Sequence, residues 1–352
     1  MKRKQSTIIM AFVLLCACAF QTAKAQKVGT SSLQFLKVMP TARATALGEA
    51  YVAFGSGIDG IFWNPAMLTG ITGHEATSTY TQWLFDTKQY ALAYGLSLGS
   101  LGRAGIQFQV TDIGSINETS VENLGYTDYQ NNSNPGSFHD GLTGRTFTPN
   151  SWVLGLSYAK QMTDHFSMGL TAKYVSESLW DGSTITAPDI YGNLQTFNTS
   201  VKMVLFDFGM LYNTGYRTLR IGTSVQNFGA QVRFAQEAYP APMVFRLGLA
   251  VDVIGKNALL SESSNNCMTL TTDIIQPNDY DQQLHFGAEY MFANLFALRV
   301  GYKWNYDADG LTFGGGANFD LDLIVISADY SYGSMSQYLT NVHRISLGVK
   351  FK

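Results

Sequence analysis

Apolar and polar residues alternate with a period of two along most of this chain, in segments of about 8 to 11 residues. Such alternation predicts β-strands with one apolar and one polar face. A tilted strand needs about 9 to 11 residues to cross a bilayer, so the segment length favours membrane strands. Fourteen strands are predicted, the first of them poorly patterned, at residues 76–82, 90–98, 104–110, 152–158, 166–174, 204–212, 219–225, 245–251, 268–274, 284–290, 296–304, 311–319, 324–332 and 345–351.

The connections between these segments alternate in length, as they do in a barrel of antiparallel hairpins with both termini on the periplasmic side. Short turns are predicted at residues 99–102, 161–165, 213–218, 293–295 and 320–322. Long extracellular loops are predicted at residues 111–151, 175–200, 228–242 and 275–283. Residues 252–267 break the rule, because this connection is long where a short turn is expected.

The face opposite the apolar residues is predicted to line the lumen. Ten mid-strand glycines fall on it by parity, which indicates that something approaches the backbone closely there: Gly95, Gly105, Gly155, Gly169, Gly209, Gly222, Gly248, Gly287, Gly301 and Gly348. Charged residues share this face, and they would cost about 2 to 4 kcal/mol each if they faced lipid: Lys173, Asp207, Arg220, Arg246, Asp273, Glu289, Arg299, Asp329 and Arg344. Glu289 and Arg299 lie opposite each other across a short turn and are expected to pair.

A large soluble β-sandwich also alternates, but its outer faces carry many Lys and Glu residues. Here only 14% of residues are charged and 13% are aromatic, and aromatic residues at strand ends resemble interfacial girdles. Beyond the first residues no apolar stretch reaches the 18 or so needed for a membrane helix. The predicted fold class is therefore an all-β, transmembrane antiparallel β-barrel of about 14 strands.

The chain starts with a basic stretch, a short apolar run and Ala23-Lys24-Ala25, which predicts a signal peptide cleaved before Gln26. The expected division is residues 1–25 as signal peptide, 26–70 as an N-terminal plug and 71–352 as barrel. Cys267 is the one cysteine expected in the mature protein, which excludes an internal disulfide. The net charge of −3 becomes more negative once the basic signal is removed, and nothing indicates nucleic-acid binding.

Residues 41–54 are rich in Ala and predict a helix that ends in the glycines of residues 55–60. A fourteen-stranded barrel has a lumen too wide for its own side chains to fill. We expect this segment to occupy the lumen, with its small residues against the glycines of the wall. Arg43, Glu49 and Asp59 are placed to pair with the lumen charges.

Residues 35–68 resemble the N-terminal signature of the PorV/PorQ family, which is related to the FadL fatty-acid transporter. The matching features are Phe35-Leu36, Ala42-Arg43-Ala44, Leu47-Gly48, the turn at Asp59 and Trp63-Asn64-Pro65-Ala66. The resemblance implies a FadL-like outer-membrane barrel with its N-terminal segment inside, and it marks Arg43, Gly48, Asp59, Trp63, Asn64 and Pro65 as family residues.

The resemblance also implies a place in the type IX secretion system of a Gram-negative bacterium. PorV-like members bind the C-terminal domains of cargo and carry them from the translocon barrel to the attachment complex, whereas PorQ-like members act within that complex. The signature does not separate the two branches. The implied partners are the lipid bilayer with its lipopolysaccharide, secretion-system proteins and cargo, contacted through extracellular loops such as residues 111–151.

Three functions stay open: a secretion adaptor, a FadL-like passive importer of hydrophobic small molecules, and a structural partner in an outer-membrane complex. No catalytic site, metal or cofactor is expected. The G-x-S-x-G pattern at residues 95–99 lies inside an alternating strand rather than at a strand-to-helix turn. Residues 305–310 resemble the start of a calcium loop, but Gly316 stands where a Glu ligand is required, so a hairpin turn is expected.

Overall fold

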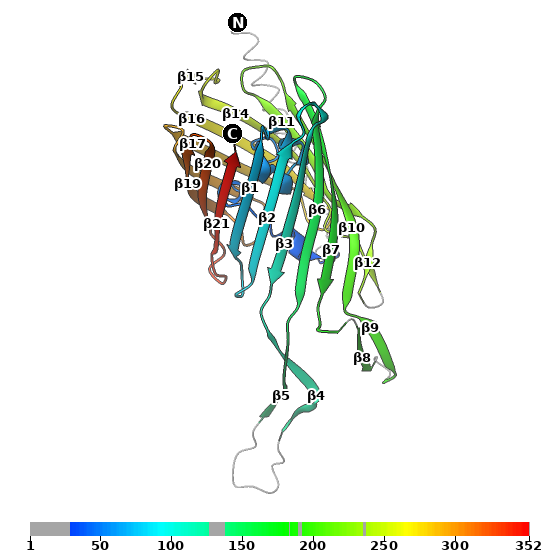
Figure 1. Cartoon of the computed structure of the whole chain (residues 1–352). Helices are drawn as coiled ribbons and strands as arrows, with labels where there is room; N and C mark the ends of the chain where they lie inside the picture. The colour runs from blue at the N-terminus through cyan, green and yellow to red at the C-terminus, as the bar shows by residue number, and fades with distance from the viewer. Residues whose placement is uncertain (1–28, 127–137, 183, 189–191, 235–236, 352) are drawn as a thin grey trace.

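A computed structural model describes residues 29–126, 138–182, 184–188, 192–234 and 237–351. Fourteen antiparallel strands close into a barrel (Figure 1). The ring closes because β1 pairs with both β2 and β21, while β11 pairs with β14. The barrel strands are β1 (His74–Gln82), β2 (Lys88–Ser97), β3 (Arg103–Asp112), β6 (Asn150–Gln161), β7 (Phe166–Ser178), β10 (Ser200–Asn213), β11 (Arg220–Gly229), β14 (Val244–Gly255), β16 (Cys267–Pro277), β17 (Gln283–Phe292), β18 (Phe296–Trp304), β19 (Leu311–Leu321), β20 (Ile324–Gly333) and β21 (Val342–Phe351).

The predicted fold class and strand number are therefore confirmed. Across the described ranges, no helix is long and apolar enough to cross a membrane. The predicted signal peptide, residues 1–25, lies outside the described residues.

The two ends of the barrel differ as the alternation of connections predicted. One end carries short turns and the C-terminus, and the other carries the long loops. The exceptional connection, residues 256–266, is at the short-turn end. There β15 (Ser261–Glu262) folds back parallel to the end of β14, and β14 still pairs antiparallel with β16. The predicted strand phase is therefore correct, and this turn is simply long.

Three of the long loops contain short sheets of their own. These are β4 (Ile116–Tyr126) with β5 (Phe138–Phe147), β8 (Thr184–Pro188) with β9 (Leu194–Asn198), and β12 (Val232–Arg233) with β13 (Ala238–Tyr239). The β4–β5 hairpin projects far beyond the barrel rim (Figure 1). Its sequence does not alternate between apolar and polar residues, which is why sequence analysis predicted a plain loop here.

The strand faces follow the predicted parity. Large apolar side chains point outward and stay exposed in the isolated chain, as Leu156 (62%) and Leu298 (69%) illustrate. The inward face holds glycines and buried polar residues, and Gly287 lies directly opposite Gly301 in the register of β17 and β18. An apolar belt around a closed ring of strands suits a bilayer, because the ring leaves no unpaired strand edge.

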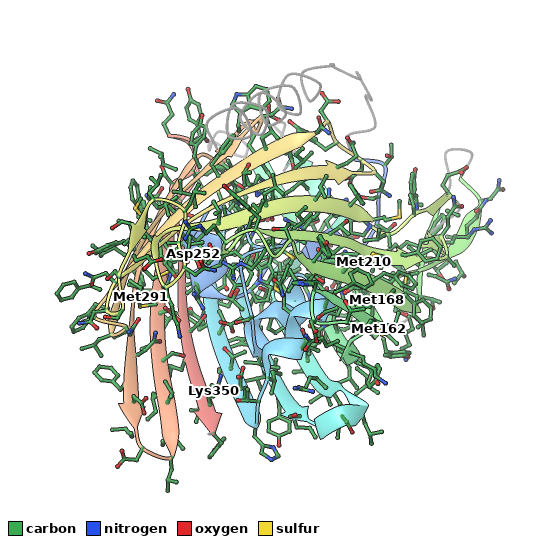
Figure 2. The ribbon with its side chains drawn as sticks, turned by 90° about the horizontal axis from the view of Figure 1, so that it is seen from above. Met162, Met168, Met210, Asp252, Met291 and Lys350 are labelled. Atoms are coloured by element: carbon green, nitrogen blue, oxygen red, sulfur yellow. The ribbon has the colours of Figure 1, made fainter. Side chains whose placement is uncertain are left out.

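The residues before β1 fold inside the ring of strands, which Figure 2 shows from the short-turn end, where Met162, Asp252 and Lys350 lie. This N-terminal segment contains η1 (Gln34–Lys37), α2 (Ala42–Ala46), η2 (Ile58–Phe62) and η3 (Pro65–Gly70). Most of its side chains are buried, including Leu47, Tyr51 and Trp63, which are fully inaccessible. It supplies the largest core cluster of the described residues.

The predicted helix over residues 41–54 is wrong in length, because α2 ends at Ala46. Gly48 and Glu49 both adopt φ of 64°, which no α-helix allows. The chain turns here because the Gly48 backbone lies against Gly301 of the wall. The amides of Tyr51 and Val52 then donate to the Asp273 carboxylate at 2.8 and 2.9 Å instead of to helix carbonyls. Tertiary contacts thus override the helix propensity of the Ala-rich sequence.

Candidate functional site

The N-terminal segment contacts every one of the fourteen barrel strands. Helix α2 packs against β18 to β21, η2 against β1 to β3, and η3 against β3, β6, β7 and β10. The turn after α2 covers the remaining four strands: Leu47 lies against β17, Val52 against β11 and β14, and Asp273 of β16 accepts the two amides described above. The segment therefore meets the whole circumference of the ring rather than one side of it.

Glycines in the wall make this close packing possible. A Cβ at Gly209 would lie 2.1 Å from the Asn64 side chain, and one at Gly169 would lie 2.4 Å from the Pro65 backbone. Both distances are far below van der Waals contact, so any larger residue would push the segment inward. Most of the ten glycines predicted to face the lumen meet this segment in the same way.

Trp63, Asn64 and Pro65, from the stretch that resembles the PorV/PorQ signature, join distant parts of the segment to the wall. The Trp63 indole donates to the Thr41 hydroxyl at 3.0 Å. The Asn64 amide donates to the carbonyls of Val52 and Met210, both at 2.9 Å, and its oxygen accepts the Ala66 amide at 3.1 Å. A fully buried amide is thereby satisfied, and Pro65 begins η3 in the position where a missing N–H costs nothing.

A four-residue ion network, which we call the lumen network, binds the segment to β17, β18 and β20. It comprises Arg43, Glu289, Arg299 and Asp329. Glu289 accepts from Arg43 at 2.8 Å and from Arg299 at 2.5 Å, and Arg299 also pairs with Asp329 at 2.6 Å. The predicted pairing of Glu289 with Arg299 is present, and Arg43 of the segment joins it. Two cations and two carboxylates balance in a buried site, which is the arrangement that makes buried charge tolerable.

A second group of charges holds the turn after α2. Glu49 pairs with Lys303 at 2.6 Å and lies 4.0 Å from Arg246, and Lys303 also contacts Asp309 at 3.2 Å. The Arg246 guanidinium lies 5.3 Å from the centre of the Trp63 ring, within the range of a cation–π contact. Lys303 has the same parity as Arg299, so the strand pattern contained a signal for it that sequence analysis missed.

Three other predicted lumen charges have separate partners. Asp207 pairs with Lys173 at 2.6 Å within the wall, while Arg220 pairs with Asp252 at 3.2 Å and donates to the Phe54 carbonyl. Asp59 was also expected to pair with a lumen charge. None of the ion pairs found among the described residues includes it, and its buried Oδ1 has no hydrogen-bond partner there.

The beginning of the segment is fastened at the long-loop end of the barrel. Asp279, between β16 and β17, accepts hydrogen bonds from Lys37 at 2.6 Å, from Gln34 at 3.3 Å and from the Ser31 hydroxyl. Burial alone would raise the pKa of Asp279, but the hydrogen bonds from Lys37 and Ser31 outweigh it and lower that pKa. No sequence pattern marked Asp279, because its role depends on a loop meeting a distant segment.

Loss of the Asp279 carboxylate is expected to release the start of the segment. A lowered folded-state pKa means that the contact stabilises at neutral pH and is lost only as the pH falls below the ordinary carboxyl range, near 3.8. Asp279→Asn should reproduce the release at pH 7 by speeding amide hydrogen exchange at Leu36 and Val38. Asp86→Asn, an exposed site on the β1–β2 turn, is the matched control. Unchanged exchange in Asp279→Asn would contradict the fastening role.

A cavity of about 450 Å³ opens at the same end of the barrel. Its floor is formed by residues 34–39 of the segment, and its walls come from strand residues near this end and from the turns that join them. Aromatic and charged side chains share the lining, which includes Trp83, Tyr280, Tyr306, Lys37, Glu49, Arg246, Lys303 and Asp309. The residues resembling a calcium loop form part of this rim as the connection between β18 and β19. The described part of the chain holds no group of ligands suited to a metal ion.

A closed barrel with an apolar outer face and a polar, filled lumen defines a transmembrane β-barrel of the outer-membrane class. The family model described as "Type IX secretion system membrane protein PorP/SprF" matches residues 143–349, more than half of the chain. The chain therefore belongs to the PorP/SprF family. The predicted outer-membrane location and the assignment to type IX secretion agree with this membership. The finer resemblance to PorV and PorQ rests on residues 35–68, outside the matched range.

Solved structures support the fold. The toluene transporter TodX of Pseudomonas putida is 15% identical, with a TM-score of 0.54 over 87% of this chain and 96% of that chain. The monoaromatic hydrocarbon channel CymD is 12% identical, with a TM-score of 0.53 over 90% of this chain and 98% of that chain. A search among curated proteins finds no relative. At these identities the likeness confirms the FadL-like barrel and carries no statement about substrate.

Proposed function

We propose that the protein is a non-enzymatic outer-membrane component of the type IX secretion system that binds cargo or partner proteins through its extracellular loops. In this role it helps to carry or attach cargo at the cell surface. Membership of the PorP/SprF family supports the secretion role. The filled lumen supports a binding role over a conducting one, because the segment reaches all fourteen strands.

Exposed apolar side chains at the long-loop end of the barrel carry this proposal. Phe85 is 79% exposed, Leu194 75% and Tyr338 85%, and all three lie at the long-loop end, outside the strands that meet lipid. Exposed aromatic and aliphatic residues away from the bilayer are typical of protein interaction surfaces. The β4–β5 and β8–β9 hairpins also present strand edges that lie outside the barrel sheet, and a partner strand can add to such edges.

The bases of these two hairpins contact each other. Phe147 at the end of β5 packs against Trp180 with ring centres 4.4 Å apart. The Thr148 amide donates to Asp181 at 3.1 Å. The joined hairpins therefore form a surface at a defined position on the rim, which suits recognition of a partner protein.

Removal of the β4–β5 hairpin tests the proposal. A short Gly-Ser turn in place of residues 116–147 should leave the barrel assembled, because the hairpin pairs only with itself. Capture of secretion-system proteins or cargo from cells by the tagged barrel should fall roughly tenfold or more, since an interface concentrates its energy in few residues. The control shortens residues 257–265, the long turn on the opposite end. Equal capture by the hairpin variant and the intact chain would overturn the proposal.

The outer cavity supports one alternative, a FadL-like passive importer of hydrophobic small molecules. Its aromatic lining suits an apolar ligand, but its buried charges do not. Each neighbouring pair of barrel strands is also hydrogen-bonded, and the described ladders shift register only at bulges, between Phe206 and Phe208 and between Asp252 and Ile254. Loss of uptake of an apolar compound on gene deletion, with secretion intact, would favour the importer over the adaptor.

A further inference from the structure

We infer that the outer face of the barrel contains a binding groove for one acyl chain of an anionic phospholipid in the periplasmic leaflet. The groove is almost wholly apolar, has a volume of about 550 Å³ and crosses the outer face from the turn before β11 to the start of β19. It is separate from the lumen and from the loops of the proposed function, and it stands whether or not that function is correct.

The depth of the groove follows from the small residues beneath it. Thr272 and Ala288 form its floor among outward side chains that are much larger, such as Leu270, Phe286 and Tyr302. The lining also reaches Gly287 and Gly301, whose positions face the lumen. The floor is therefore close to the backbone itself, and the segment packs on the other side of it at Leu47 and Gly48.

The shape of the groove fits an extended chain. Leu249, Thr272, Phe286, Tyr302 and Leu311 are successive partners across the strand registers, and Leu219 extends the line to the turn before β11. Six neighbouring strands give five spacings of about 4.8 Å each, or about 24 Å in all. The acyl chains of one leaflet occupy half of a hydrocarbon core about 30 Å thick. The groove is therefore long enough to take one chain along its length.

Charge assigns the headgroup to the short-turn end. Arg217 lies two residues before Leu219, and Lys256 lies in the turn that follows β14, so both are at the periplasmic rim beside the groove. Arg217 is 3.8 Å from Glu262 in an exposed pair, which leaves this rim net positive. The opposite end, before Leu311, carries Asp307, beside Asp309 that already pairs with Lys303. A phosphate headgroup is attracted to the first end and repelled by the second.

Native mass spectrometry of the full chain, taken from nanodiscs of phosphatidylethanolamine and phosphatidylglycerol, tests the inference. One phospholipid should remain bound, with phosphatidylglycerol preferred. Ala288→Leu fills the floor and should reduce the bound fraction roughly tenfold, whereas Ala328→Leu, the same change on the outer face of β20, should not. Arg217→Gln with Lys256→Gln should remove the preference for phosphatidylglycerol, and Lys160→Gln at another periplasmic strand end should keep it.

Several outcomes would overturn the inference. One is that no lipid is retained, and another is that Ala288→Leu and Ala328→Leu retain it equally. A third is that a lipoprotein or a second copy of the chain stays bound instead of the lipid, and that Ala288→Leu abolishes this binding. The groove would then be a protein interface. Every variant must still migrate differently in SDS gels before and after boiling, which shows that the barrel has assembled. If Ala288→Leu does not assemble, Ala288→Val replaces it, because its side chain fills less of the groove.

Discussion

Deletion of residues 34–68 is expected to turn a non-conducting barrel into an open channel. The deleted residues contact all fourteen strands, and the side chains of a barrel this wide cannot fill the lumen without them. Single-channel conductance in a planar bilayer should rise roughly tenfold or more over the intact chain. Conductance equal to that of the intact chain would show that the segment does not block passage.

A substitution separates loss of the segment from loss of folding. A Cβ at Gly301 would lie 2.0 Å from the Gly48 nitrogen, and backbone atoms cannot rotate away as a flexible side chain does. Gly301→Leu should therefore displace the segment and raise conductance while every strand is retained. Gly315→Leu on neighbouring β19 is the matched control, because only the Ala297 carbonyl lies near, at 3.6 Å. Both variants should still shift in SDS gels on boiling if the barrel has assembled.

The barrel itself was predictable because its pattern is local. Each strand is a run of alternating residues, and the bilayer requires the same apolar face on all of them, so parity alone placed Glu289 and Arg299 on the lumen side. Their mutual pairing followed from a short turn between two neighbouring strands. Even β1, whose outward residues include Ala76 and Ser78, was included despite its weak pattern, and it brings the count to the even number that such a barrel requires.

The lumen contacts were harder to predict because they join residues far apart in the chain. Composition alone indicated that small residues of the segment would meet glycines of the wall, but not that α2 would end at Ala46. The turn at Gly48 depends on β18, and the fastening at Asp279 depends on a loop some 240 residues away along the chain. For Asp59 the sequence predicted too much, because its charge suggested an ion pair that the geometry does not provide.

Glu289→Gln is expected to destabilise the barrel strongly, because it removes one partner of a buried charge network. Glu289 accepts from both Arg43 and Arg299, and the side chains of Glu289 and Arg299 are 6% and 2% exposed. The amide keeps the shape of the carboxylate but leaves the lumen network with an excess positive charge. Breaking such a pair costs about 3–5 kcal/mol of folding free energy. The loss is measured from the urea midpoint of unfolding, followed by tryptophan fluorescence of the barrel in lipid vesicles.

The exposed pair of Glu118 and Arg145, 3.4 Å apart on the β4–β5 hairpin, supplies the control. Glu118→Gln should change stability by no more than about 1 kcal/mol, because water screens the pair. Adding Arg43→Met to Glu289→Gln should recover part of the loss, since the unmatched cation is then gone while Arg299 keeps its pair with Asp329. Recovery would show that the segment and the wall are coupled through this carboxylate. If the two changes only add, Arg43 is held by packing alone and the lumen network ends at the wall.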